Sequence, residues 1–350
     1  MKDEYQHYML KEISEQPKII KRIIKKYIGK DTYFIDKEIL NALKNANTIY
    51  IIASGSSYHA GLIGKSLFEK LARKKAESII ASEFVYNMPL IDENSFFLII
   101  SQSGETGDLK EALSKIKDLG YKTLTITNTP DSYLSKNADY SLFLEAGKEV
   151  SIPATKSFIA TLALLSILAN AISGQPINIK EELLKVASTV QNLYNKKAVY
   201  QNIANSLKDN KLIFLLGTSF DFYATLEISL KLKETAYIPA FALPIKEFFH
   251  GPITLLEEGT SVIILNTLKE SSKVVRNAIK EISNKEGKVV IISLEDISES
   301  KDNIIIPQVH FLFTSFVTVV LGQLIAYYTA LARNTEIDNP RNLTKSVPLL

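Results

Sequence analysis

The stretch SQSGET at residues 101–106 follows an apolar run that ends at Ile100 and precedes a helical pattern that begins near Leu109. A strand that delivers hydroxyls, an amide and a glycine to the start of a helix forms an anion site, because the free backbone N–H groups and the helix dipole both favour negative charge. An ordinary strand-to-helix turn with a hydroxyl cap has a similar sequence. The composition of this turn favours phosphate as its ligand.

A second turn of the same kind, ASGSS at residues 53–57, follows the apolar run Ile49–Ile52. In sheets of parallel strands, ligands bind at the carboxyl ends of the strands, which is where both serine turns are expected. The sequence therefore predicts one phosphate site built from two turns. It contains neither a G-x-G-x-x-G nor a Walker motif, so no nucleotide cofactor is expected.

The chain repeats itself. The segment around Gly55 aligns with LIFLLGTSFDFYA from Leu212, and the strand pattern after Gly120 aligns with the one after Gly287. Where the first copy has SQSGET, the second has ILNTLK at residues 264–269, without a glycine that lets an anion approach the backbone. We expect a single phosphate pocket, in the first copy.

Each copy alternates short β-branched strands with amphipathic helices, a pattern typical of a doubly wound α/β domain with a parallel sheet. The predicted fold is therefore α/β, with two tandem domains of this kind, N-terminal helices and a C-terminal tail, which the family resemblance given below implies to lie over the active site. The predicted boundaries are an N-terminal helical segment at 1–40, a first domain at 41–182, a linker helix at 183–205, a second domain at 206–335 and the tail at 336–350.

Composition excludes several classes of protein. The 350 residues are 46% hydrophobic, and the net charge of +3 is spread along the chain, so no nucleic-acid partner is expected. The absence of cysteine excludes disulfides and a cysteine nucleophile, and no cluster has metal-ligand spacing. Met1–Tyr5 lacks the apolar core of a secretory signal, and polar residues interrupt the run Phe311–Leu331, which is predicted to be a buried helix. A cytoplasmic protein without a membrane span is expected.

The second copy carries three groups with acid–base or nucleophilic chemistry, and each has a plain structural interpretation. Glu234 shares a helix face with Glu227 and Lys231, a spacing typical of a solvated, salt-bridged face. His250 precedes Gly-Pro, where a histidine commonly makes a structural hydrogen bond. Lys345 lies near the chain end, where lysine is usually exposed. The local patterns leave both interpretations open.

As a set, these residues place the chain close to a known family. The sequence resembles the tandem sugar isomerase (SIS) domains that form the isomerase half of glutamine–fructose-6-phosphate aminotransferase. The resemblance runs from end to end. Its motifs, in order, are HYMLKEISEQP at 7–17, GSSY at 55–58, ASEF at 81–84, SQSGET at 101–106, ATKSF at 154–158, LKLKE at 230–234, HGP at 250–252 and DNPRNLTKSV at 338–347.

The resemblance implies a role for each matching residue. Glu234 matches the base that moves a proton between sugar carbons 1 and 2, and Lys231 a lysine that lines the same site. His250 matches the ring-opening acid–base of the neighbouring subunit, which implies a homodimer, and Lys345 the amine that forms a Schiff base with the open-chain ketose. The implied ligands of the sugar phosphate are Ser56, Ser57, Ser101, Gln102, Ser103 and Thr106.

Aldose–ketose isomerisation requires groups of these types: a carboxylate near carbons 1 and 2, a group that titrates near neutrality and a cation or amine at the carbonyl. No metal or cofactor is implied. The sequence also departs from the aminotransferase pattern. It has no cysteine to hydrolyse glutamine, Glu247-Phe-Phe-His250 is closer to the stand-alone glucosamine-6-phosphate deaminases, and the chain ends in Pro348-Leu-Leu instead of an acidic residue.

Three functional interpretations remain. The first is an isomerase/deaminase that interconverts glucosamine 6-phosphate with fructose 6-phosphate and ammonia. The second is the isomerase subunit of the aminotransferase, supplied with ammonia by a separate glutaminase chain. The third, a non-catalytic sugar-phosphate sensor, needs only the serine turns. The retained Glu234, His250 and Lys345 argue against the sensor, and the first interpretation is preferred.

Overall fold

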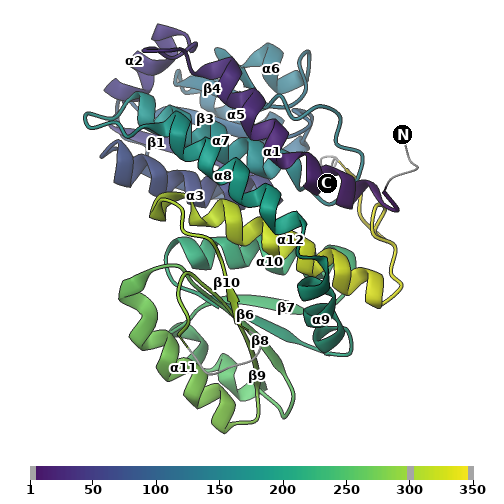
Figure 1. Cartoon of the computed structure of the whole chain (residues 1–350). Helices are drawn as coiled ribbons and strands as arrows, with labels where there is room; N and C mark the ends of the chain where they lie inside the picture. Colours follow the sequence, from purple (N-terminus) through teal and green to yellow (C-terminus); the bar gives the residue numbers. More distant parts are fainter. Residues whose placement is uncertain (1–4, 298–302, 346–350) are drawn as a thin grey trace. The chain divides into compact units, whose positions relative to one another are not determined.

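The computed structural model describes residues 5–297 and 303–345, which form two compact units. The first-copy unit contains residues 15–149, 156–187 and 344–345, and the second-copy unit contains residues 5–14, 150–155 and 188–343. Each unit has a five-stranded sheet covered by helices (Figure 1). The predicted α/β fold with two tandem parallel-sheet domains is confirmed.

The first-copy sheet has the strand order β2-β1-β3-β4-β5, and every neighbouring pair is parallel. Strands β1 and β3 are buried along their whole length, which explains why their sequences are rich in β-branched and aromatic residues. The strands are β1 (Thr48–Ala53), β2 (Lys75–Ile80), β3 (Phe96–Ser101), β4 (Lys122–Thr127) and β5 (Tyr140–Phe143).

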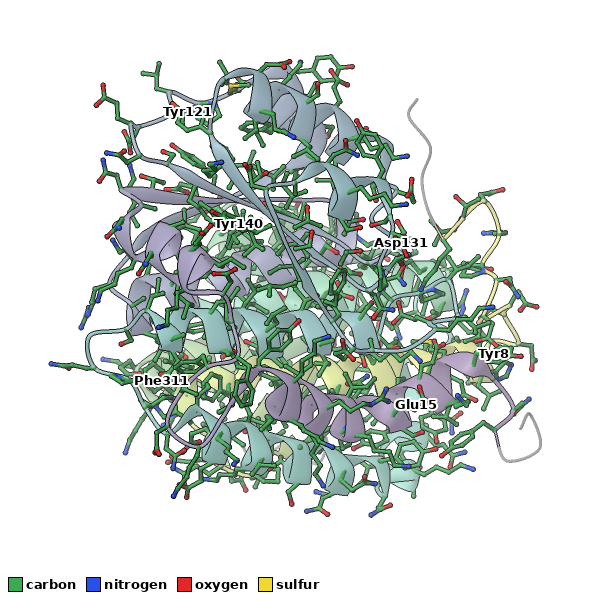
Figure 2. The ribbon with its side chains drawn as sticks, turned by 90° about the horizontal axis from the view of Figure 1, so that it is seen from above. Tyr8, Glu15, Tyr121, Asp131, Tyr140 and Phe311 are labelled. Carbon is green, nitrogen blue, oxygen red and sulfur yellow. The ribbon has the colours of Figure 1, made fainter. Side chains whose placement is uncertain are left out.

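Helices cover both faces of this sheet. Tyr50 and Ile52 of β1 pack with Phe97 into a core that α4 and α5 cover. Ile51, which points to the opposite face, lies against α3, and α3 packs on α7. Figure 2 labels Tyr121 beside the start of β4 and Tyr140 on the edge strand β5. The helices of this unit are α2 (Lys37–Asn45), α3 (Gly55–Leu71), α4 (Ala81–Tyr86), α5 (Gly107–Asp118), α6 (Tyr133–Asn137) and α7 (Lys156–Ala171).

The second-copy sheet has the order β10-β9-β8-β6-β7, which is the first-copy order read from the other edge. Its strands are β6 (Ile213–Gly217), β7 (Ala240–Pro244), β8 (Ser261–Asn266), β9 (Lys288–Ser293) and β10 (Asn303–Ile305). The strands that the sequence repeat aligns, β1 with β6 and β4 with β9, hold equivalent places. The repeat is therefore a repeat of topology.

In the second-copy unit, α11 (Ser272–Asn284) packs on one face of the sheet and α10 (Phe220–Ala236) on the other, with α12 (Thr314–Ala332) on α10 (Figure 1). A Cβ on Gly322 of α12 would lie 2.3 Å from Ile228 Cγ1 of α10, so only glycine permits this close packing. Of the described helices, one is long and apolar enough to cross a membrane, and 94% of its apolar window is buried. The run Phe311–Leu331 is a buried helix, as predicted.

The remaining helices lie outside the two repeats. Residues 183–205, predicted as one linker helix, fall on two helices, α8 (Ile179–Tyr194) and α9 (Lys197–Leu207), and α1 covers Tyr8–Tyr27. Short 3-10 turns are η1 (Glu247–Phe249), η2 (Pro252–Leu255), η3 (Lys269–Ser271) and η4 (Phe311–Phe313). Residues 1–4 of the predicted N-terminal segment and 346–350 of the predicted tail lie outside the described residues.

Candidate active site

The two serine turns lie at the switch point of the first-copy sheet. Strand β1 has β2 on one side and β3 on the other, so the chain reverses direction across the sheet between β1 and β3. Ligands bind at this position in doubly wound folds. SQSGET joins β3 to α5, and Ser56 and Ser57 form the first turn of α3, directly after β1. The structure thus brings the two turns to neighbouring strand ends.

The SQSGET turn is shaped by its own hydroxyls. Ser101 Oγ is buried, accepts a hydrogen bond from Gly104 N at 3.0 Å and lies 3.0 Å from Thr106 Oγ1. Ser103 Oγ accepts a hydrogen bond from Glu105 N at 3.1 Å. Gly104 has φ +68°, and a Cβ there would lie 2.0 Å from Ser132 Oγ. The glycine is required both for its backbone conformation and for space.

Both turns leave their helix starts without a side-chain cap. Ser54 precedes α3 and Thr106 precedes α5, and neither side chain accepts a hydrogen bond from the first helical N–H groups. Ser54 Oγ is buried and has no hydrogen-bond partner among the described residues. Buried polar atoms are nearly always satisfied, so an unsatisfied hydroxyl at a helix start suits an anion ligand. Ser54 was missing from the ligands predicted from the sequence.

In the second copy, the carboxylate of Asp221 lies at the strand end that corresponds to the SQSGET turn of the first copy. Asp221 on the first turn of α10 is buried, and its carboxylate accepts hydrogen bonds from Thr267 N and Thr267 Oγ1, both at 2.7 Å. Thr267 directly follows β8, the strand equivalent to β3. An internal carboxylate therefore takes the donors at this strand end, in agreement with a single phosphate pocket.

Burial raises the pKa of Asp221 to about 6, although the hydrogen bonds from Thr267 act in the opposite direction. A folded-state pKa above the unfolded value means that stability is present at low pH and is lost as the pH rises through the folded pKa. We expect the stability of Asp221→Asn relative to wild type to rise by ~3 kcal/mol between pH 4 and 7. Urea unfolding across this range measures the difference, and a constant difference would contradict the assignment.

An ion triad forms on α10. Lys231 Nζ lies 2.6 Å from Glu234 Oε2 and 3.3 Å from Glu227 Oε1. The predicted shared helix face is present, but it is not solvated, because the side chains of Lys231 and Glu227 are fully buried and Glu234 is 16% exposed. Burial alone would lower the pKa of Lys231, but the two carboxylates outweigh it and raise the pKa above the ordinary lysine value. Lys231 is therefore a buried cation held between two carboxylates.

Glu234 faces a pocket of about 450 Å³. The segment 340–343 forms one wall, and it is anchored to Tyr237 at the end of α10: the Arg341 guanidinium lies 4.5 Å above the tyrosine ring, and Arg341 N donates to Tyr237 Oη at 3.0 Å. Lys233 and Pro239 complete the walls with Ile238. A partly exposed carboxylate that opens into a pocket can accept a proton from a carbon acid.

His250 lies apart from this triad, at the end of η1, with its side chain exposed and its backbone N–H bonded to Glu247 O at 3.0 Å. It is not part of a hydrophobic core. An exposed histidine suits the role that the resemblance implies, in which it serves a neighbouring subunit.

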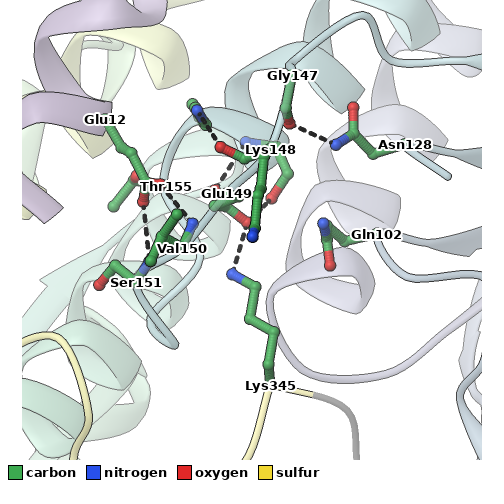
Figure 3. Close-up of polar contacts among 12 residues, drawn as sticks. Glu12, Gln102, Asn128, Gly147, Lys148, Glu149, Val150, Ser151, Thr155 and Lys345 are labelled. Carbon is green, nitrogen blue, oxygen red and sulfur yellow. Dashed lines mark hydrogen bonds and ion pairs between the residues drawn. The ribbon is translucent and has the colours of Figure 1, made fainter. Parts of the chain in front are cut away.

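Lys345 belongs to the first-copy unit and contacts Glu149, a residue that sequence reasoning missed. Lys345 Nζ lies 2.8 Å from Glu149 Oε2 (Figure 3). The two residues are 196 positions apart in the chain, so no local pattern could connect them. Among the described residues, no group of three or more His, Cys, Asp or Glu side chains could hold a metal ion.

Comparison with known proteins places this fold and site in a family. The model of the SIS domain matches residues 42–171 and 206–333, one match in each copy. The chain belongs to the SIS domain family, and the predicted resemblance is confirmed.

Relatives within the family include aminotransferases. The chain is 42% identical, over 99% of its length, to glutamine–fructose-6-phosphate aminotransferase (isomerizing) of Shouchella clausii (strain KSM-K16), and it spans 59% of that relative's length. The C-terminal domain of glucosamine-fructose-6-phosphate aminotransferase from Francisella tularensis superposes with a TM-score of 0.91 at 29% identity, covering 97% of this chain and 100% of that one. Glucosamine-6-phosphate deaminase from Thermotoga maritima shares the fold, with a TM-score of 0.79, 23% identity and coverage of 98% and 100%.

Proposed function

We propose that the protein interconverts fructose 6-phosphate plus ammonia with glucosamine 6-phosphate plus water. The observation that carries the proposal is the α10 triad, in which a buried lysine contacts Glu234 at the wall of a pocket. Homology to the aminotransferase over 99% of the chain supports the choice of substrate. The retained triad argues for an enzyme over a sugar-phosphate sensor.

Each site residue has a proposed role in this reaction. Glu234 transfers the proton between carbons 1 and 2, Lys231 holds that carboxylate in position, and Lys345 forms a Schiff base with the open-chain ketose. His250 opens the sugar ring, supplied by the partner in a homodimer. The phosphate ligands are the groups on the two first-copy turns: Ser56, Ser57, Ser101, Gln102, Ser103 and Thr106.

The reaction is tested with the purified chain and two substrate mixtures. Glucosamine 6-phosphate should release ammonia and fructose 6-phosphate, and fructose 6-phosphate with ammonium should form glucosamine 6-phosphate. The ratio of the two initial rates at fixed substrate concentrations shows whether deamination or synthesis of glucosamine 6-phosphate is faster. No product in either mixture would contradict the proposal.

A separate glutaminase chain is the alternative source of ammonia, and the specific observation in its favour is the 42% identity to an aminotransferase over 99% of this chain. Fructose 6-phosphate with glutamine as the only nitrogen source should then give no glucosamine 6-phosphate, since the chain has no cysteine.

We further propose that the protein acts in the cytoplasm without nucleic acid or membrane partners. The even charge distribution and the buried α12 support this proposal.

The phosphate site gives a prediction for affinity. Replacing Ser101 and Thr106 together with alanine should raise the Kd for fructose 6-phosphate more than tenfold, because charge-assisted hydrogen bonds contribute about 1.5–3 kcal/mol each. Titration calorimetry measures the change. Ser271→Ala, at the corresponding strand end of the second copy, should change the Kd less than twofold. Unchanged affinity in the double variant would remove this turn from the site.

A further inference from the structure

The two side chains of the contact between Lys345 and Glu149 are exposed to solvent to different extents. The Glu149 side chain is fully buried, whereas the Lys345 side chain is 27% exposed. An ion pair that only anchors a chain segment gains little at a surface. Here, the carboxylate is fixed inside the first-copy unit while the amine remains accessible from solvent. A small carbonyl compound can therefore reach the nitrogen without displacing the carboxylate.

Glu149 is held rigidly from two sides. Ser157, in the first turn of α7, donates from its backbone N to Glu149 Oε1 at 3.1 Å and from Oγ to Oε2 at 2.8 Å. The segment before Glu149 is fixed as well, because Asn128 Nδ2 donates to Gly147 O at 2.7 Å and Lys156 Nζ donates to Lys148 O at 2.8 Å (Figure 3). The oxygen that contacts Lys345 thus has a fixed position.

A lysine forms a Schiff base only as the neutral amine, and an exposed ammonium is almost fully protonated at neutral pH. A carboxylate within hydrogen-bond distance stabilises the ammonium in the resting protein, and it is also placed to accept the proton as a carbonyl approaches the nitrogen. Glu149 Oε2 is at 2.8 Å from Lys345 Nζ. We propose that Glu149 is the proton acceptor that activates Lys345 for attack on the ketose carbonyl, an inference that rests on the proposed function.

The step balances in protons and electrons. A proton passes from Lys345 Nζ to Glu149, and the nitrogen lone pair forms a C–N bond while the C=O π pair moves to oxygen. That oxygen takes a second proton from nitrogen to give the carbinolamine. Glu149 then returns its proton to the hydroxyl, the C–O bond breaks, and water leaves. The product is a protonated imine beside the Glu149 carboxylate, so no further reactant is needed.

The test measures trapping of the imine. The full chain is incubated with fructose 6-phosphate and cyanoborohydride, and the hexose adduct on the Lys345 peptide is followed by mass spectrometry. Glu149→Gln keeps the side-chain shape and should lower the trapping rate at pH 7 about 100-fold, as expected for the loss of a general base. The Kd for fructose 6-phosphate should change less than threefold. Glu145→Gln, which removes an exposed carboxylate from the same segment, should trap at the wild-type rate.

The pH dependence separates proton transfer from simple positioning. Without Glu149, solvent must deprotonate the amine, so the ratio of wild-type to variant rates should fall about tenfold per pH unit between pH 7 and 9. A ratio that does not change with pH would overturn the proposal and leave Glu149 as a structural partner.

Glu149→Asp serves if the glutamine variant does not fold, as judged by circular dichroism. It keeps a carboxylate but withdraws it by one methylene, so trapping should fall at least tenfold at unchanged Kd, and a wild-type rate would overturn the proposal. Failure of the proposed function is distinct, since wild type itself would then form neither a Lys345 adduct nor product. Wild-type trapping together with equal rates in Glu149→Gln and Glu145→Gln would refute this inference alone.

Discussion

Glu234→Gln should lower kcat by about 10²–10⁴-fold while the Kd for fructose 6-phosphate stays within threefold of wild type. The amide keeps the shape of the carboxylate and can still contact Lys231, but it cannot accept a proton from a sugar carbon. Product assays give kcat, and titration calorimetry gives the Kd.

Glu281→Gln is the matched control, because it removes an exposed helical carboxylate from α11 of the same unit. Its kcat should equal that of wild type. A Glu234→Gln variant that keeps more than a tenth of wild-type kcat would show that another group moves the proton.

Lys231→Met should lower the free energy of unfolding by ~3–5 kcal/mol. The change removes the cation 3.3 Å from Glu227, which is fully buried, and loss of a charged partner inside a protein is costly. Urea unfolding followed by circular dichroism measures the loss.

The control is Lys65→Met on α3, where the amine pairs at 2.7 Å with Glu69, the residue four positions on, and both side chains are partly exposed. This exposed pair should contribute less than ~1 kcal/mol. Adding Glu227→Leu to Lys231→Met should recover part of the lost stability, because no unpaired charge remains at position 227. A loss below ~1 kcal/mol in Lys231→Met would mean that Glu227 is already neutral.

The fold and the positions of the two serine turns could be predicted because they depend on order along the chain. The apolar runs before residues 53 and 101 identify two strands, and the polar turns that follow lie at their carboxyl ends. The repeat identifies the second sheet in the same way. Helical spacing also places Glu227, Lys231 and Glu234 on one face.

The environments of these residues could not be predicted in the same way. Spacing on α10 favours a solvated face, whereas Lys231 is fully buried in a helix that packs against both α12 and the second-copy sheet. The contact between Glu149 and Lys345 joins residues far apart in sequence. In the sequence, Asp221 is an ordinary acidic residue in the first turn of a helix. Its hydrogen bond with Thr267, 46 positions further on, is seen only in the structure.

The Asp221 contact also bears on how the two copies respond to substrate. In the second copy, the Asp221 carboxylate accepts the hydrogen bonds from Thr267 at the strand end, so these donors need no ligand from solution. In the first copy, Ser54 Oγ has no hydrogen-bond partner among the described residues, and the starts of α3 and α5 have no side-chain cap, which suits the proposed anion site. A ligand that contacts a helix start opposes the local opening of that segment. Amide exchange through local opening should therefore slow with rising fructose 6-phosphate at the start of α5, and remain constant at the start of α10.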